Sequence, residues 1–344
     1  MNIIPTTFNE MLPSYTVIGG RERHGSAGLS AILLNRGRHY GRRNLFHDME
    51  KTGFDNVVSM EPPPAQYDLD ELTNQFPFVR FVLLREHLTL GEQINLAVSE
   101  LDSPLFFVLW SDLRFIAGGG AHRMVERLSY STSNGDKLGE GSSFRRLCTV
   151  PVIQSSRFET LPTVIAPALH RKKVHTRVLS PLREGLRTLY PFDGVGIYDR
   201  ERFIRMGGFD GTLKSCYWQL MDFGFRAHLW GEEISATQMV KLSYEVPTPV
   251  EDNSAGTDYH RFYLKNLAPV FHKDYAHLPL HRFPGFLLQS RENLFSAFEN
   301  FSEGRRWVNT NRFRWRCDPR TILGFWNMDN DKDGLPHLER ESSA

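Results

Sequence analysis

Short apolar runs alternate with helical patterns through the first 120 residues, and this alternation restricts the fold more than any other feature. Helical patterns occupy residues 26–53, the segment "DLDELTNQF" and residues 89–101. Runs typical of strands lie at residues 15–20, 56–61, 79–84 and 105–112. Because strands that alternate with helices at this spacing form parallel sheets, we expect an α/β fold with a doubly wound, mostly parallel sheet.

Local end signals support several of these elements. Residues 26–53 are expected to form one or two helices that stop at Gly53. Thr89 precedes a segment with apolar residues on one helical face and is a candidate N-cap. Further along the chain, residues 155–192 are expected to be irregular and residues 258–344 largely helical.

The composition favours a folded chain with no strong electrostatic field. Of the 344 residues 40% are hydrophobic, and the formal net charge is +1, so no global charge points to nucleic acid as a partner. The cysteines are too far apart for a metal or disulfide pattern, which favours a reducing cytoplasm. The N-terminus lacks the pattern of a signal peptide, and no window approaches the ~18 apolar residues of a membrane span. The three cysteines are Cys148, Cys216 and Cys317.

Carboxylates follow the predicted strands. In a doubly wound sheet, ligands bind beyond the carboxyl ends of the strands, so these side chains would face one cleft. Each one taken alone is also an ordinary turn residue or helix cap, so the residue types leave both interpretations open. The carboxylates at or just past a predicted strand end are Glu22, Glu61, Glu86 and Asp112.

A more specific pattern lies in residues 190–231, "YPFDGVGIYDRERFIRMGGFDGTLKSCYWQLMDFGFRAHLWG". It resembles the acceptor half of the inverting glycosyltransferases of the GT-A fold, in the family 2 group that includes cellulose and chitin synthases. The family stretch looks like GGFDE…WEDVDLxxRxxxxG. The resemblance implies a GT-A fold, with Gly208, Trp218 and Arg226 binding the acceptor. The matching residues are Gly207, Gly208, Phe209, Asp210, Trp218, Asp222, Arg226 and Gly231.

The first half resembles the nucleotide-binding half of the same family. "LFFVLWSDL" resembles the strand that ends in the DxD motif, with Asp112 in the place of its last Asp and Trp110 and Ser111 replacing its companions. Asn95 matches the Asn of the family helix GxxxARNxA, and Glu61 takes the place of the acidic residue that faces the base. The implied donor-binding residues are Gly19, Arg21, Glu22, Glu61, Asn95 and Asp112.

The resemblance also implies a divalent cation and a catalytic base. Mn²⁺ or Mg²⁺ would be held by Asp112, with His272 as a late ligand, although a lone His also serves as a packing or capping residue. An inverting transfer needs a carboxylate to accept the proton of the attacking hydroxyl. The family triplet WED reads Trp218-Gln219-Leu220 here, so Asp222 is the candidate base. Asp222 is equally placed to pair with Arg226 four residues later.

Arginine and aromatic residues dominate two further segments. The arginines of residues 36–43 are expected on a solvated helix face. Residues 303–320 mix aromatic residues with arginines, a mixture suited to an anionic lipid surface or single-stranded nucleic acid. The preceding helix is expected to dock its apolar face on the catalytic domain or a second subunit, and residues 329–339 are expected to be a disordered acidic tail. That apolar face comprises Leu294, Phe295, Phe298 and Phe301.

The sequence as a whole predicts a GT-A-like domain over residues 1–250, with a nucleotide-binding half (15–117) and an acceptor half (118–250). Residues 251–344 would form a helical C-terminal extension with a flexible acidic tail. The predicted function is a glycosyltransferase of the hexosyltransferase type that moves a sugar from a nucleotide-sugar donor to a glycan or other hydroxyl acceptor, with inversion. The alternative is a degenerate GT-A domain that binds sugar nucleotides or acts as a scaffold, because the DxD and ED motifs are incomplete. Peripheral membrane contact and a homo-oligomer are the further predicted associations, with no nucleic acid.

Overall fold

The structure is a computed structural model. The described residues are 13–36, 42–63, 69–117, 119–133, 146–170, 173–248, 254, 256–322 and 326. The predicted acidic tail at 329–339 lies outside them.

A nine-stranded sheet forms the centre of the described structure, in the order β1-β4-β3-β2-β5-β10-β7-β11-β6. The strands β4, β3, β2 and β5 are parallel to one another, whereas β10 runs antiparallel to both of its neighbours, β5 and β7. The bounds are Tyr15–Gly19 (β1), Leu29–Leu34 (β2), Val57–Glu61 (β3), Val79–Leu84 (β4), Leu105–Trp110 (β5), Leu113–Ala117 (β6), Cys148–Gln154 (β7), Gly196–Asp199 (β10) and Ile234–Tyr244 (β11). The predicted α/β class is confirmed.

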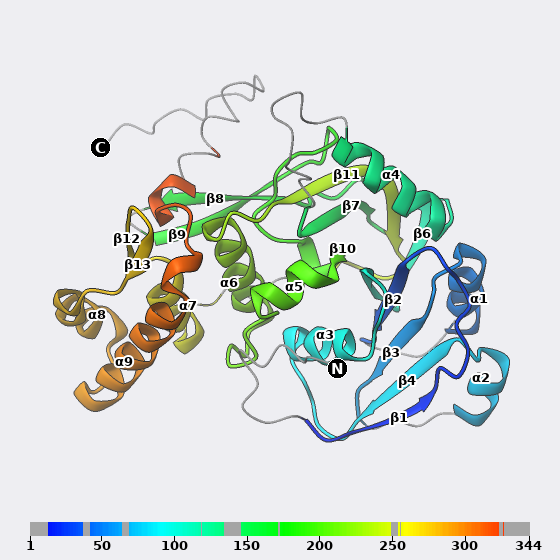
Figure 1. Ribbon diagram of the computed structural model, residues 1–344, viewed down its shortest axis with the longest axis horizontal. Coiled ribbons are helices and arrows are strands. Elements are labelled where there is room, and N and C mark those ends of the chain that lie inside the picture. The colour runs from blue at the N-terminus through cyan, green and yellow to red at the C-terminus, as the bar shows by residue number, and fades with distance from the viewer. Residues whose placement is uncertain are drawn as a thin grey trace.

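Helices lie around the sheet, and α7, α8 and α9 gather at the end of the molecule opposite α1 and α2 (Figure 1). The N-cap predicted at Thr89 is confirmed at the start of α3, and it forms a full capping box with Glu92. The Thr89 hydroxyl accepts from the Glu92 amide, and the Glu92 carboxylate accepts from the Thr89 amide. The bounds are Arg42–Thr52 (α1), Leu69–Gln75 (α2), Leu90–Ser99 (α3), Ala121–Ser133 (α4), Arg200–Met206 (α5), Cys216–Leu229 (α6), Thr257–Asn266 (α7), Phe283–Ser290 (α8) and Leu294–Asn311 (α9).

The sequence analysis assigned the first parallel strand of the sheet to the wrong segment. Residues 29–34, expected in a helix, form β2, and all six of its residues are buried. A strand covered on both faces has no alternation of apolar and polar residues, so its pattern cannot be distinguished from that of a buried helix. Residues 15–19 do form a strand, but β1 is an antiparallel edge strand beside β4. The first parallel strand is therefore β2, and Gly53 ends α1 with a positive φ of 79°.

Two hairpins were not predicted. Residues 155–192, expected to be irregular, contain the antiparallel pair β8 (Val164–His170) and β9 (Lys173–Leu179). The C-terminal region contains a short second pair, β12 (Val270–His272) and β13 (Tyr275–His277), which packs against α9. Within the described residues, no helix is long and apolar enough to cross a bilayer.

The apolar face predicted for the C-terminal helix is buried only in part. Phe301 is 1% exposed and lies against the rings of Phe283 and Phe286 from α8. Phe295 is 87% exposed and Phe298 59% exposed, so only part of the face docks on the rest of the chain. Docking of the exposed part on a second subunit stays a prediction. The tip of the α8–α9 pair instead presents these rings, with Leu288 and Leu294, to the surface.

Two phenylalanines of α9 therefore form a matched pair for a stability test. Phe301→Ala removes a fully buried ring and should lower the free energy of unfolding by about 3–5 kcal/mol. Phe295→Ala removes an exposed ring and should change it by less than about 0.5 kcal/mol. Urea unfolding followed by circular dichroism measures both, and equal losses would contradict the packing described for α9.

A second stability test concerns the pH dependence that His228 confers. Its Nε2–H donates to the Thr188 carbonyl at 3.0 Å, and burial lowers the pKa of the imidazole to about 4 from its usual 6.5. Because the unfolded chain takes up the proton first, this contribution to stability is complete above pH 6.5 and is lost as the pH falls toward 4. His228→Gln should flatten the decline in unfolding free energy over this window, while the exposed His87→Gln should leave it unchanged. If the unfolding free energy of both variants declined over this pH range as much as that of the wild type, His228 would not be the cause of the decline.

Candidate functional site

Charged side chains converge where the parallel strands end. Asn35 and Arg36 follow β2, Glu61 is the last residue of β3, and Asp112 follows β5 by two residues. Since β2, β3 and β5 are parallel, these positions lie at one edge of the sheet, the edge at which doubly wound folds bind ligands. The second half of the chain adds Asp193 to the same cluster, across 157 residues of sequence from Arg36.

The guanidinium of Arg36 joins two carboxylates. Its Nε donates to Asp112 Oδ2 at 3.0 Å, and its Nη2 reaches Asp112 Oδ1 at 3.5 Å. On the other side, Nη1 and Nη2 donate to the two oxygens of Asp193 at 3.0 and 2.6 Å. The guanidinium carbon lies 4.1 Å from the ring centroid of Trp110, a cation–π contact that also fixes its plane. The cluster of Arg36, Asp112 and Asp193 is hereafter the carboxylate–arginine cluster, and its formal charge is −1.

Asp193 is held in place by several independent contacts. It adopts left-handed backbone angles (φ 56°, ψ 21°), which are uncommon for a residue other than glycine and frequent at functional sites. Its carbonyl accepts from Trp110 Nε1 at 2.9 Å, and its carboxylate accepts from the Tyr244 hydroxyl at 2.7 Å. Burial raises the pKa of this carboxyl group, and the contacts to Arg36 and Tyr244 only partly offset that rise.

Both partners of Asp193 have shifted pKa values. Burial by itself lowers the pKa of Arg36, but Asp193 and Asp112 outweigh it, so the guanidinium is held charged. Burial raises the pKa of Tyr244, and the charge of Asp193 adds to this, so its hydroxyl remains a donor. The cluster is thus one cation held between two carboxylates.

Sequence reasoning missed Asp193. The signal available was weak: Asp193 precedes Gly194 in a segment between two predicted elements, and Asp is among the residues that tolerate left-handed backbone angles.

Sequence reasoning also placed the arginines of residues 36–43 on a solvated helix face, which is wrong for two of them. Arg36 belongs to the cluster because residues 29–34 form a strand, and Arg42, 6% exposed, pairs with Glu61.

The expected divalent cation does not fit the residues as they lie. Both oxygens of Asp112 are within 3.5 Å of Arg36. Unit charges about 4 Å apart interact by about 4 kcal/mol at an effective dielectric constant of about 20, so a divalent ion on Asp112 would meet roughly twice that repulsion from Arg36. The described residues contain no group of three or more His, Cys, Asp or Glu side chains suited to a metal.

The second expected metal ligand, His272, is not placed with Asp112. It lies in the β12–β13 hairpin, and its ring stacks on that of His277 with the centroids 5.0 Å apart. That hairpin packs against α9 rather than against the carboxyl edge of β5. The structure therefore does not bring the two proposed ligands together.

Glu61 and Asn35 form a buried polar group at the ends of β3 and β2. Ser59 Oγ donates to Glu61 Oε1 at 2.7 Å, and Asn35 Nδ2 donates to the Met60 carbonyl. Glu61 Oε2 and Asn35 Oδ1 are buried and have no hydrogen-bond partner among the described residues. These two acceptors lie covered at this edge, and a buried acceptor without a partner favours an N–H donor that reaches it.

Three predicted donor-binding residues lie elsewhere. Gly19 is the last residue of β1, and Arg21 and Glu22 follow it. Because β1 runs antiparallel to β4, Gly19 lies opposite Arg80, near the start of β4. The amide of Glu22 donates to the carbonyl of Pro77, which precedes β4. These residues thus lie at the amino edge of the parallel strands, and the structure does not bring them together with Asp112.

The matched GGFD segment is attached to α3 and α6. Asn95, fully buried in α3, accepts from the Phe209 amide at 2.9 Å and donates to the Phe209 carbonyl at 2.8 Å. Arg226, fully buried in α6, donates to the carbonyls of Met206 and Gly208. In this arrangement Asn95 and Arg226 hold the turn between α5 and α6, and neither is open to solvent.

The candidate base Asp222 is fully buried, and both of its oxygens are engaged. Oδ2 pairs with Arg226 at 3.1 Å, and Oδ1 accepts from Lys265 and Asn266 at 2.8 Å each. Gln219, in the place of the family carboxylate, accepts from the Gly91 amide at 2.9 Å and so connects α6 to α3. As they lie, neither side chain presents an acceptor atom to solvent. The role of Asp222 as a base stays a prediction.

Trp218 likewise faces the C-terminal helices. It is 4% exposed, its Nε1 donates to the Ser254 carbonyl at 2.8 Å, and its ring lies against Tyr259 and Phe262. The predicted acceptor-binding residues Gly208, Trp218 and Arg226 thus contribute to packing around α6, and acceptor binding by them stays a prediction.

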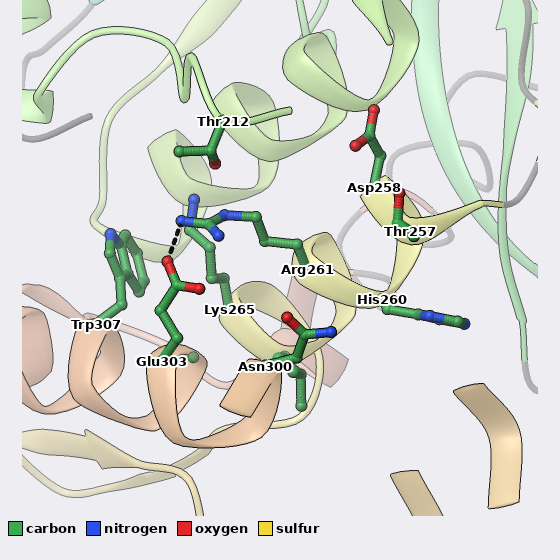
Figure 2. A pocket seen from close by; sticks show the side chains of 11 residues that line it. Thr212, Thr257, Asp258, His260, Arg261, Lys265, Asn300, Glu303 and Trp307 are labelled. Carbon is green, nitrogen blue, oxygen red and sulfur yellow. Dashed lines mark ion pairs between the residues drawn. The ribbon is translucent and has the colours of Figure 1, made fainter. Parts of the chain in front are cut away.

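A cavity of about 160 Å³ lies between α7, α9 and the loop before α6. Figure 2 shows Arg261 and Lys265 of α7 side by side, with Glu303 of α9 paired to Arg261 at 2.8 Å. Lys265 and Arg261 also bind Asp210, and they hold its pKa below the usual value although burial opposes this. Ligand sites typically measure about 300–1,000 Å³, so this cavity is small for a nucleotide sugar.

Gly208 provides a test of the packing between α3 and the GGFD turn. Gly208 and Gly53 both have positive φ, 69° and 79°, but only at Gly208 would an added Cβ overlap Asn95 Oδ1. Gly53→Ala should cost about 1–2 kcal/mol of unfolding free energy through its backbone angle alone. Gly208→Ala should cost about 2 kcal/mol more, because the buried Asn95 loses its bonds to Phe209. Equal losses in chemical denaturation would contradict the Asn95 contact.

The comparisons with known proteins bear on the fold. The sequence matches no protein-family model and no curated protein. Its structure is similar to that of GalNAc-T7 with UDP, GalNAc and Mn²⁺, with a TM-score of 0.51 and 11% identity, covering 91% of this chain and 58% of that one. A mannosyltransferase, PcManGT from Pyrobaculum calidifontis in complex with GDP-Man and Mn²⁺, aligns with a TM-score of 0.42 and 10% identity, covering 96% and 79% of the two chains.

At this identity the first likeness shows the fold alone. The chain spans little more than half the length of GalNAc-T7. The predicted GT-A-type α/β fold is confirmed.

Proposed function

We propose that the chain is a glycosyltransferase that takes a hexosyl group from a nucleotide-sugar donor and transfers it, with inversion, to the hydroxyl of a glycan or other acceptor. The observation that carries this proposal is the carboxylate–arginine cluster at the carboxyl ends of β2 and β5, in a fold of the GT-A type. This edge is where an open α/β sheet binds a nucleotide.

The donor would lie along this edge with its base toward β3 and its diphosphate toward β5. Glu61 Oε2 and Asn35 Oδ1, buried acceptors without a partner in the described part of the chain, suit the ring N–H of a base such as uracil or guanine. Asp112 follows β5, two strands away from β3, and Arg36 follows β2, which lies between them. Both lie at the same edge, beside the expected diphosphate. No step is assigned to a divalent cation, because Arg36 engages both oxygens of Asp112.

A second candidate function is a domain that binds a nucleotide sugar without transferring it. This alternative is favoured by the contacts of Asp222, which pairs with Arg226, Lys265 and Asn266, and by Gln219 at the family position of the base. Asp222 would then serve only to hold α6 and α7 together.

Three further parts of the proposal concern organisation and partners. The domain boundary near residue 250 places α7, α8 and α9 in a C-terminal extension that packs on α6 through α7. A peripheral membrane contact and a homo-oligomer both remain proposals. The exposed apolar tip of α8 and α9 is the surface on which either would be tested.

Nucleotide binding is the first requirement of both functions. UDP, GDP or one of their sugars should raise the melting temperature of the protein, since a ligand present at about 100 times its Kd adds about 2.7 kcal/mol of stability. Differential scanning fluorimetry with inorganic phosphate as the control measures this. If no nucleoside diphosphate shifts the melting temperature beyond the phosphate control, both functions are refuted.

Turnover then distinguishes the enzyme from the binding domain. If Asp222 is the base, Asp222→Asn should lower kcat for release of UDP or GDP from the bound sugar nucleotide by about 10²–10⁴ while donor affinity is kept. Asp210→Asn is the matched control, because Asp210 is as buried and also binds Lys265. It should destabilise the fold similarly but change kcat only a few-fold.

Two outcomes would count against Asp222 as the base. Equal kcat losses in the two variants would assign Asp222 to packing. A wild-type protein that binds a sugar nucleotide but never releases the nucleoside diphosphate from it would favour the second candidate function, a domain that binds without transfer.

A further inference from the structure

The carboxylate–arginine cluster has the form of a cation site already filled from within the chain. Asp112 comes from the end of β5 and Asp193 from the turn before β10, so their carboxylates approach from two different elements. Between them lies one guanidinium, within 3.0 Å of an oxygen of each. Two carboxylates that converge in this way would ordinarily repel each other unless a cation lies between them.

Arg36 is built into this position rather than resting on a surface. Its side chain is 26% exposed, and those of Asp112 and Asp193 are 10% and 9% exposed. Trp110 covers the guanidinium at 4.1 Å, and the indole of the same residue donates to the Asp193 carbonyl. The hydroxyl of Tyr244 donates a further hydrogen bond to the Asp193 carboxylate. Trp110 thus positions both the cation and one of its anions.

We propose that Arg36 takes the place of a divalent cation in this protein, so that nucleoside diphosphates bind at the cluster without a metal ion. The part of this inference that concerns nucleoside diphosphate binding rests on the proposed function. The part that Arg36 excludes a metal ion from Asp112 and Asp193 is independent of that function. An arginine is permanently charged and cannot dissociate, and so the site keeps its cation at any concentration of free metal.

The charge balance explains what Arg36 does for a diphosphate. Without it, Asp112 and Asp193 would place two negative charges beside the ligand; with it, the formal charge is −1. The same guanidinium binds oxygen atoms of both Asp112 and Asp193. Removing Arg36 should therefore have two opposite effects, because it frees two carboxylates for a metal and increases the repulsion of a diphosphate.

The first arm of the test measures metal binding with no nucleotide present. Mn²⁺ is titrated into the full-length protein and its free fraction followed by electron paramagnetic resonance. Wild-type protein should take up no Mn²⁺ at millimolar concentration, whereas Arg36→Gln should bind it at least tenfold more tightly, and Arg36→Gln/Asp112→Asn should lose that gain.

The controls are chosen on charge. Arg36→Lys keeps a positive charge at the cluster without the planar guanidinium, so its gain in Mn²⁺ affinity should be smaller than that of Arg36→Gln. Arg43→Gln removes an exposed arginine that pairs with Glu71 outside the cluster and should behave like the wild type. If Arg36→Gln fails to fold by circular dichroism, the wild-type titration decides alone. Tight Mn²⁺ binding by the wild type that Asp112→Asn abolishes would overturn the proposal.

The second arm measures nucleotide affinity by calorimetry, with UDP and GDP, in EDTA and in Mn²⁺. The wild type should bind equally in both, and Arg36→Gln should bind at least tenfold more weakly in EDTA and recover in Mn²⁺. A wild-type affinity that rises tenfold or more with Mn²⁺ would overturn the inference. If neither nucleotide binds in either buffer, the proposed function fails, while the first arm still decides whether Arg36 excludes the metal.

Discussion

The contact of Arg36 with Asp112 and Asp193 connects the two halves of the central sheet at the candidate site. Asp112 belongs to the parallel half that ends in β5, whereas Asp193 precedes β10, which is antiparallel to β5 and begins the second half. A buried carboxylate without a cation would be costly, so the turn at Asp193, with its left-handed backbone, depends on Arg36 and Tyr244. The contacts that shape the candidate site are therefore the same contacts that stabilise this turn.

Asn95 in the first half, and the residues that carry the family resemblance in the second half, have a different physical role. Asn95 and Arg226 are fully buried, and both bind backbone atoms of residues 206–209. Asp222 forms ion pairs with Arg226 and Lys265 in the interior. Such contacts hold α3, α6 and α7 together whether or not the chain catalyses transfer. Binding and catalysis can thus be separated by experiment.

Much of the fold follows from local signals, and the exceptions have physical causes. The strands at 79–84 and 105–110 and the capped helix after Thr89 were predictable because apolar runs and caps act within a few residues. Residues 29–34 were misassigned because a strand buried on both faces shows no alternation. Asp112 was recognised from its place after an apolar strand. Arg36 and Asp193 were not, because nothing local marks a contact across 157 residues.

The central claim is that a nucleoside diphosphate binds at the carboxyl edge of β2, β3 and β5. A crystal structure of the full chain with UDP or GDP, whichever binds more tightly, tests this most directly. The account predicts density for the diphosphate beside Arg36 and Asp112, and for the base beside Glu61. Density for the nucleotide in the cavity between α7 and α9, or at the amino edge beside Arg21, would contradict it.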